Sequence, residues 1–319
     1  MRLIYLLTLV LLLSACRNSS SKTEESPASK ARQTTFVFPE IPEMLTEPEQ
    51  RLSFLVRHYW DKFDFADTTL LADPAIGEQG FVNFIALFPQ TDSTDLTAGL
   101  DSLVKRAEPH QEAFAFLLDK ADKYLYDPNS PYVNEELYVQ FVRPFLASRA
   151  IGYADKSRLE FRLELASKNR PGTPATDFKF ITYPGKASSS LYATPAEQLL
   201  LVFYDPECES CRATLQALMQ SDILARKLTE NVRVLAVYTE GNADVWAATA
   251  SGMPRTWQVA ADTACTVKDT PLYDLKAMPS LYLLDARKRV ILKDASVSAL
   301  LDYWEGDNRH SSRQQEPGH

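Results

Sequence analysis

Residues 199–211 read LLLVFYDPECESC, and this stretch decides the fold of the second half of the chain. Residues 199–204 form a continuous apolar run, which is typical of a strand buried on both faces of a parallel sheet. Cys208 and Cys211 follow as a Cys-x-x-Cys pair, and the next apolar residues recur at helical spacing. A second apolar run at 232–238 predicts a neighbouring strand. The pattern indicates a βαβ unit with its cysteines where strand meets helix, a context in which such a pair is redox-active.

Further elements extend this unit in both directions. Alternation over residues 177–181 and a turn at 183–186 predict a hairpin with 189–192 as its second strand. Toward the C-terminus the sequence predicts a short helix at 244–250, strands at 280–285 and 290–292, and a closing helix at 295–304. The expected order is therefore a hairpin, strand, helix, strand, helix, a proline-led hairpin and a last helix.

Several separated motifs in the second half match a known family. They are Pro174-Ala175-Thr176-Asp177-Phe178 with Gly185-Lys186, Cys208-Glu209-Ser210-Cys211, and Met278-Pro279. Over residues 170–306 the chain resembles the extracytoplasmic thioredoxin-like thiol-disulfide oxidoreductases, most of all the membrane-anchored, TlpA/ResA-like group with an N-terminal hairpin. The resemblance implies an α/β thioredoxin-like fold with a central mixed sheet. The whole chain also resembles bacterial lipoproteins that join an N-terminal helical domain of unknown function to such a module.

The resemblance also implies roles for individual residues. Cys208 is expected to be the exposed nucleophile that forms a mixed disulfide, and Cys211 the more buried thiol that resolves it. Pro279, if cis, would face the pair, and Met278 would offer backbone pairing to an extended substrate. A helix N-terminus carries partial positive charge, which favours the thiolate of the first cysteine. The implied partners are thiols and disulfides of exported proteins and an electron donor, and no cofactor is expected.

The motif departs from thioredoxin at several positions. Glu207 replaces the usual tryptophan, Ser210 replaces the usual proline, and Glu209 matches a variant of the membrane-anchored group. Val202 stands where thioredoxin has a buried acid, so no general base for Cys211 is evident.

Acidic residues also surround the pair, and they lead to a prediction about electron flow. Asp205, Glu207 and Glu209 are expected to disfavour a thiolate, because like charges repel it. A less stable thiolate makes a dithiol pair less oxidising. The sequence therefore predicts a reductase or isomerase rather than a strong oxidase.

Other interpretations of the cysteines remain open. A structural zinc site needs four ligands, and beyond the pair only Cys265 is left in the second half, with no histidine nearby, so we predict no metal site. The pair could instead form a purely structural disulfide. Cys265 fits a small buried hydrophobic residue, with a third redox thiol as the alternative.

The first half has helical periodicity and no catalytic constellation. Apolar residues recur at i, i+3, i+4 and i+7 in stripes between residues 46 and 168, which predicts five or six amphipathic helices in a domain over 41–168. An aromatic cluster stands out at Tyr59, Trp60, Phe63 and Phe65. It fits either a packed core or a ligand groove.

The N-terminus has the features of an export signal. Arg2 precedes an apolar run that is shorter than the about 20 residues a membrane span requires, which fits a signal peptide over residues 1–15. Leu13-Ser14-Ala15-Cys16 resembles the bacterial lipobox, which implies lipid on Cys16. Arg17 follows where an aspartate would suggest retention in the inner membrane, so an outer-membrane anchor is expected. Polar residues then predict a disordered tether over 16–40 and a disordered tail over 307–319.

Composition limits the class of function. Apolar residues make up 45% of the 319-residue chain, which is sufficient for packed cores, and the formal net charge of −8 argues against nucleic-acid binding. Two functions remain: a tethered thiol-disulfide oxidoreductase, or a lipoprotein that binds a partner through its helical domain and uses the second fold as a scaffold.

Overall fold

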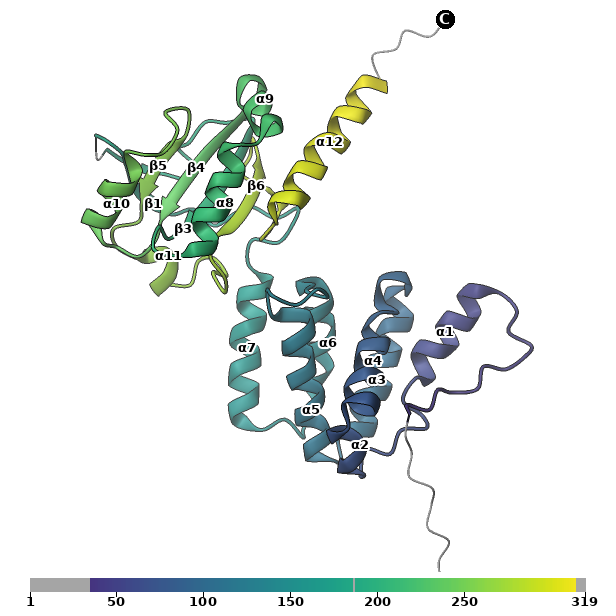
Figure 1. The fold of residues 1–319 in the computed structure, drawn as a ribbon. Helices are drawn as coiled ribbons and strands as arrows, with labels where there is room; N and C mark the ends of the chain where they lie inside the picture. Colours follow the sequence, from purple (N-terminus) through teal and green to yellow (C-terminus); the bar gives the residue numbers. More distant parts are fainter. Residues whose placement is uncertain (1–34, 186, 314–319) are drawn as a thin grey trace, which may run out of the picture. The chain divides into compact units, whose positions relative to one another are not determined.

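The structure is a computed structural model that describes residues 35–185 and 187–313, with side chains up to residue 306. We call residues 48–167 the helical half; Figure 1 draws it in purple to teal. Its α-helices are α1 Pro48–His58, α2 Thr68–Ala72, α3 Gln79–Ile85, α4 Ser93–Ala107, α5 Gln111–Ala121, α6 Glu135–Ala147 and α7 Tyr153–Ser167. Shorter helical turns are η1 Pro74–Glu78, η2 Phe88–Gln90 and η3 Asp122–Tyr126. The predicted helical architecture is confirmed, with one short helix, α2, that periodicity did not reveal.

The helical half has one apolar core in which aromatic rings dominate. Tyr59, Trp60, Phe63 and Phe65 are all buried there and stack on one another and on Phe36. Burial of large aromatic side chains supplies most of the hydrophobic free energy of such a core. The cluster is therefore packing and not an open groove.

The second half, which we call the sheet half, is built on a seven-stranded mixed sheet of order β2-β1-β5-β4-β3-β6-β7. Strands β3, β4 and β5 are parallel, and the other neighbouring pairs are antiparallel. The strands are β1 Lys179–Thr182, β2 Ser188–Ser190, β3 Gln198–Tyr204, β4 Val232–Tyr238, β5 Gln258–Ala261, β6 Ser280–Asp285 and β7 Val290–Leu292. The helices are α8 Glu209–Met219, α9 Asp222–Glu230, α10 Ala243–Ala250, α11 Thr266–Asp269 and α12 Val297–Arg313 (Figure 1).

Strand β3 is the centre of the sheet half, because side chains 199–204 are completely buried. Leu200, Val202 and Tyr204 face a core that includes residues of α8, α10 and α12. Their neighbours in the strand, such as Phe203, face a second core with Tyr273. Full burial of a large apolar side chain contributes about 1.5–3 kcal/mol. The prediction of a strand buried on both faces is confirmed.

Some predicted boundaries are wrong, each for a local reason. Strand β5 was not predicted, because its four residues include two small alanines and no long apolar run. The helix after Cys211 is in fact two helices, since Ser221 caps α9 by accepting a hydrogen bond from the Leu224 N–H at 3.2 Å. Helix α12 continues to Arg313, so residues 307–313 are not a disordered tail. Polar residues can continue a helix whose first turns are already packed.

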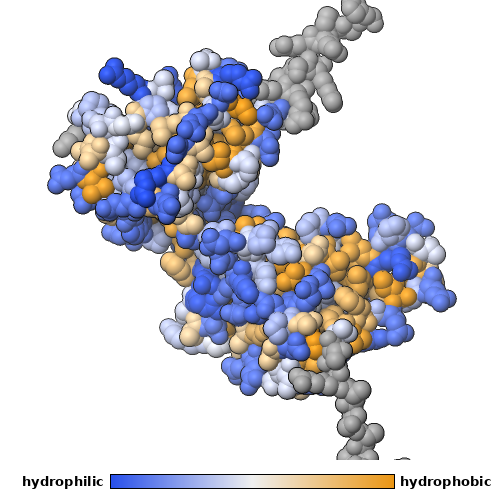
Figure 2. Space-filling model, viewed as in Figure 1, coloured by the Kyte–Doolittle hydropathy of each residue, from blue (hydrophilic) through white to orange (hydrophobic). Residues whose placement is uncertain are grey.

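Several predictions concern residues that the structure does not describe. The signal peptide, the lipid site Cys16, most of the tether, Lys186 and residues 314–319 lie outside the described residues. Within the part of the chain that the structure does describe, no helix is both long enough and apolar enough to cross a bilayer. On the face seen in Figure 2, hydrophilic and hydrophobic residues are interspersed over both halves.

A close approach of α1 to α4 gives a stability test of the helical half. A Cβ added to Gly99 would lie 2.8 Å from the Val56 carbonyl oxygen, which is backbone and cannot easily move. Overpacking typically costs about 1–3 kcal/mol, so we expect Gly99→Ala to lower the free energy of unfolding by about 1–2 kcal/mol in urea titrations. Gly306→Ala, also in a helix but with nothing within 4 Å, is the matched control and should leave stability unchanged or raise it.

Candidate functional site

The turn between β3 and α8 presents the cysteine pair. Strand β3 ends at Tyr204, and Cys208 is the N-cap of α8, with extended backbone angles of φ −82° and ψ 128°. The Asp205 carboxylate accepts a hydrogen bond from the Glu207 N–H at 2.9 Å. The Arg212 guanidinium donates to the carbonyl oxygens of Pro206 and Glu207, at 3.0 and 3.1 Å. The turn is therefore fixed at both of its ends.

The two cysteines of the pair have different surroundings. Cys211 is completely buried in the core under β3, whereas Cys208 is partly exposed; both are free thiols in this structure. Burial raises the pKa of Cys211 to about 12, although the Asp205 N–H, 3.4 Å from its sulfur, acts in the opposite direction. Of these two cysteines, Cys208 is the one that combines access to solvent with a place at the N-cap of α8.

A hydroxyl and a carbonyl face the Cys208 sulfur. Ser210 Oγ lies 2.9 Å from Cys208 Sγ and 2.8 Å from the carbonyl oxygen of Met278, which is itself 3.7 Å from the sulfur. The Met278–Pro279 peptide bond is cis. We call Cys208, Ser210, Cys211 and the Met278 carbonyl the exchange site.

The hydrogen bonds of the exchange site favour the thiolate of Cys208. Its pKa is lowered, first by the hydrogen bond with the Ser210 hydroxyl and then by the backbone N–H of Cys211. Donors aimed at a sulfur stabilise its charged form. The exchange site thus pairs an accessible thiol of lowered pKa with a buried thiol of raised pKa.

Comparisons with known proteins agree with this fold. A thioredoxin-like protein from Bacteroides caccae has a crystal structure that is 38% identical, covers 86% of this chain and 99% of its own length, and gives a TM-score of 0.78. The chain belongs to the thioredoxin-like proteins. The predicted fold class is therefore confirmed.

The remaining comparisons concern parts of this thioredoxin-like protein. The model of a domain of unknown function (DUF5106) matches residues 15–169, which include the helical half. Two Bacteroides fragilis proteins are also similar. The C-terminal domain of an uncharacterized protein is 32% identical, covers 44% of this chain and 99% of its own, and gives a TM-score of 0.42. A conserved protein of unknown function is 37% identical, covers 42% of this chain and 98% of its own, and gives a TM-score of 0.40. None of the curated proteins matches the chain.

In this thioredoxin-like protein, hydrogen bonds and not the acidic residues around the pair set the direction of the Cys208 pKa. Asp205, Glu207 and Glu209 were expected to disfavour the Cys208 thiolate, yet the pKa of Cys208 is lowered. Glu207 and Glu209 are exposed, and water screens their charges. The charge of Asp205 instead contributes to the raised pKa of Cys211. A stabilised thiolate makes a dithiol pair more oxidising, whereas the choice between a reductase or isomerase and an oxidase stays a prediction.

Val202 and Cys265 are two further positions that the sequence singled out. Val202 is completely buried at the position where thioredoxin has its acid, so it supplies no proton acceptor for Cys211. Cys265 has a left-handed backbone (φ 52°), and its sulfur lies where a Cβ on Gly241 would come within 2.6 Å. Burial and the charges of Asp269 and Asp262 raise its pKa, which disfavours a reactive thiolate. No cluster of three potential metal ligands occurs among the residues that the structure describes.

Two contributors to the exchange site were not identified as such from the sequence. Ser210 was noted only as a replacement for proline, and Arg212 was not singled out. Their spacing contains a usable signal: a hydroxyl two residues after the first cysteine, and an arginine one residue after the second, both lie in the first turn of α8. Polar side chains in the first turn of a helix lie close to backbone groups that have no partner within the helix.

The contact between Ser210 and Cys208 can be tested by alkylation. Ser210→Ala removes the hydroxyl that contributes most to the lowered pKa of Cys208, so the pKa should rise. A hydrogen bond to a charged group contributes about 1.5–3 kcal/mol, and about 1.4 kcal/mol corresponds to one pKa unit, so the rate of iodoacetamide reaction at pH 7 should fall roughly tenfold or more. The measurement is the pH profile of alkylation of reduced protein. Ser298→Ala, remote from the pair, is the control; an unchanged profile in Ser210→Ala would contradict the assignment.

Proposed function

We propose that this protein is a thiol-disulfide oxidoreductase that exchanges disulfides of exported proteins through Cys208 and Cys211. The observation that carries the proposal is the difference between the two sulfurs: the pKa of the accessible Cys208 is lowered, and that of the buried Cys211 is raised to about 12. This combination suits a first cysteine that attacks the substrate disulfide and a second cysteine that later resolves the mixed disulfide. It does not suit a structural disulfide, which needs no activated thiolate.

The first step forms a mixed disulfide. The Cys208 thiolate attacks one sulfur of the substrate disulfide, a bond forms between the two sulfurs, and the other substrate sulfur leaves as a thiolate and takes a proton from water. Ser210 and the backbone N–H of Cys211 stabilise the attacking charge. The carbonyl of Met278 lies 3.7 Å from the sulfur, which supports our proposal that it accepts a backbone N–H of an extended substrate.

The second step releases the product. Cys211 loses its proton and attacks Cys208 Sγ, which forms the Cys208–Cys211 disulfide and releases the second substrate thiolate. Two electrons and two protons have then passed from the dithiol to the substrate, and a dithiol electron donor restores the reduced pair. Since the reaction is reversible and the Cys208 thiolate is stabilised, we assign exchange in either direction.

Insulin reduction tests the proposed activity. The reduced protein should accelerate the precipitation of insulin B chain by dithiothreitol, and Cys208→Ser should abolish the acceleration. Cys211→Ser should accumulate a mixed disulfide with the substrate, visible on non-reducing gels, because nothing resolves it. If the native protein and Cys208→Ser give the same rate, the alternative of a partner-binding lipoprotein with a scaffold fold is favoured.

We further propose that the chain is exported and tethered by lipid on Cys16, with the outer membrane as its site. The lipobox-like sequence 13–16 and the polar segment after it support this proposal. Several acyl chains on one residue anchor a protein much more firmly than one chain does. Cys16→Ser should move the protein from the membrane fraction to the soluble fraction of its host. Cys265→Ser, which leaves the lipobox intact, should remain in the membrane fraction.

A further inference from the structure

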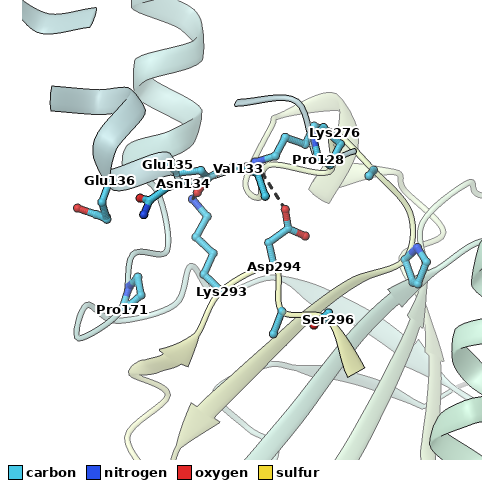
Figure 3. Close-up of a pocket in the computed structure, with 13 residues that line it drawn as sticks. Pro128, Val133, Asn134, Glu135, Glu136, Pro171, Lys276, Lys293, Asp294 and Ser296 are labelled. Carbon is cyan, nitrogen blue, oxygen red and sulfur yellow. Dashed lines mark hydrogen bonds and ion pairs between the residues drawn. The ribbon is translucent and has the colours of Figure 1, made fainter. Parts of the chain in front are cut away.

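The loop that carries Met278 and Pro279 is bound by a side chain of the helical half. Lys276 lies two residues before Met278, and its ammonium group pairs with the carboxylate of Glu135, the first residue of α6. The other carboxylate oxygen of Glu135 lies 2.7 Å from Lys293 Nζ. One carboxylate thus holds two lysines of the sheet half, as the close-up in Figure 3 shows.

The ion pairs of Glu135 are largely removed from water. The exposed fractions of the side chains are 9% for Lys276, 5% for Lys293 and 14% for Glu135. Burial alone would lower the pKa of Lys276, but the charges of Glu135 and the nearby aspartates outweigh it and raise the pKa. Removing one partner of a buried pair leaves an uncompensated charge, so such contacts fix the geometry of the elements they join.

The other end of the loop is held as well. Ser280 directly follows Pro279, and its hydroxyl lies 3.1 Å from the Asp294 carboxylate, which lies 3.5 Å from Lys276 Nζ. Lys293 also donates to the carbonyl oxygens of Ala166 and Lys168, both at 2.9 Å. The five residues from Lys276 to Ser280 are therefore fixed on both sides of the Met278 carbonyl.

A cavity separates this loop from α6. Its volume is about 410 Å³, and the residues that line it include Ala277 and Pro279 of the loop and Asn134 and Glu136 at the start of α6. Figure 3 labels Asn134 and Glu136. Glu135 spans the same gap by its pairs with the lysines. Without that carboxylate, the remaining charged partners of Lys276 are Asp274 and Asp294, which both belong to the sheet half.

We propose that Glu135 is a positioning residue of the exchange site: it holds Lys276 and Lys293 and thereby keeps the Met278 carbonyl beside Cys208. The helical half is then part of the enzyme and not an attached module. The expected effect of Glu135 on turnover rests on the proposed oxidoreductase function. Its expected effect on the loop from Lys276 to Ser280 rests on geometry alone.

Glu135→Gln tests the inference, with Glu136→Gln as the matched control. Glu136 is the next residue of α6, but it is more exposed and pairs with Arg170 instead. For insulin, which must pair with the loop, Glu135→Gln should raise the KM about tenfold or more and leave the kcat within about threefold. For a small aromatic disulfide, which needs only the Cys208 thiolate, its rate should stay within twofold of the native rate. Glu136→Gln should match the native protein with both substrates.

Amide hydrogen exchange gives a readout that does not require activity. Exchange of residues 276–281 should become at least tenfold faster in Glu135→Gln and remain native in Glu136→Gln. If Glu135→Gln is too unstable to assay, Lys293→Gln, which removes one of the two pairs, should show the same changes in smaller measure. Native exchange and a native insulin KM in Glu135→Gln would overturn the inference. Faster exchange together with no activity in the native protein would instead reject the proposed function and retain the positioning role.

Discussion

Burial of β3 on both faces is the constraint on which the exchange site depends. Because residues 199–204 have no face toward water, the chain leaves the sheet only after Tyr204, and α8 begins a few residues later on one face of the sheet. Cys208 then falls at the helix N-cap and Cys211 in its first turn, against the core. The difference in pKa between the two sulfurs follows from this placement, because Cys208 is partly exposed to solvent whereas Cys211, three residues later, lies in the core.

Long apolar patterns predicted most of the fold, whereas short elements and contacts between distant residues could not be predicted. The runs that form β3 and β4 and the stripes that form the helical half are long enough for periodicity to identify them. Strand β5 has only four residues and takes its place by pairing with β4 and β1. Its conformation is set by neighbours that are distant in sequence, which no local pattern contains.

The candidate site shows the same division. The cysteine pair and Met278–Pro279 could be located from motifs, but the direction of the Cys208 pKa could not. Counting carboxylates in the sequence gives the sign of a Coulombic effect and omits the hydrogen bonds, which depend on a hydroxyl 2.9 Å from the sulfur. Glu135 was not predicted for a related reason, because its partner Lys276 lies 141 residues away in the chain. An acidic residue at the start of a helix is also favourable in water without any partner, so its sequence position does not indicate a buried ion pair.

The single hydroxyl proton of Ser210 links thiolate formation to substrate binding in the proposed reaction. A hydroxyl has one proton, so Ser210 donates either to the Met278 carbonyl or to the Cys208 sulfur, and both acceptors are within reach, at 2.8 and 2.9 Å. When Cys208 is a thiol, its own proton can satisfy Ser210 while Ser210 donates to Met278. When Cys208 is a thiolate, the proton of Ser210 is drawn to the sulfur, because a hydrogen bond to a charged acceptor is the stronger one. In the proposed reaction, the Met278 carbonyl then loses its donor as Cys208 becomes reactive, and a substrate N–H takes the vacant place. A proline at position 210 could not make this exchange of partners, so the departure from thioredoxin lies where attack and substrate pairing meet.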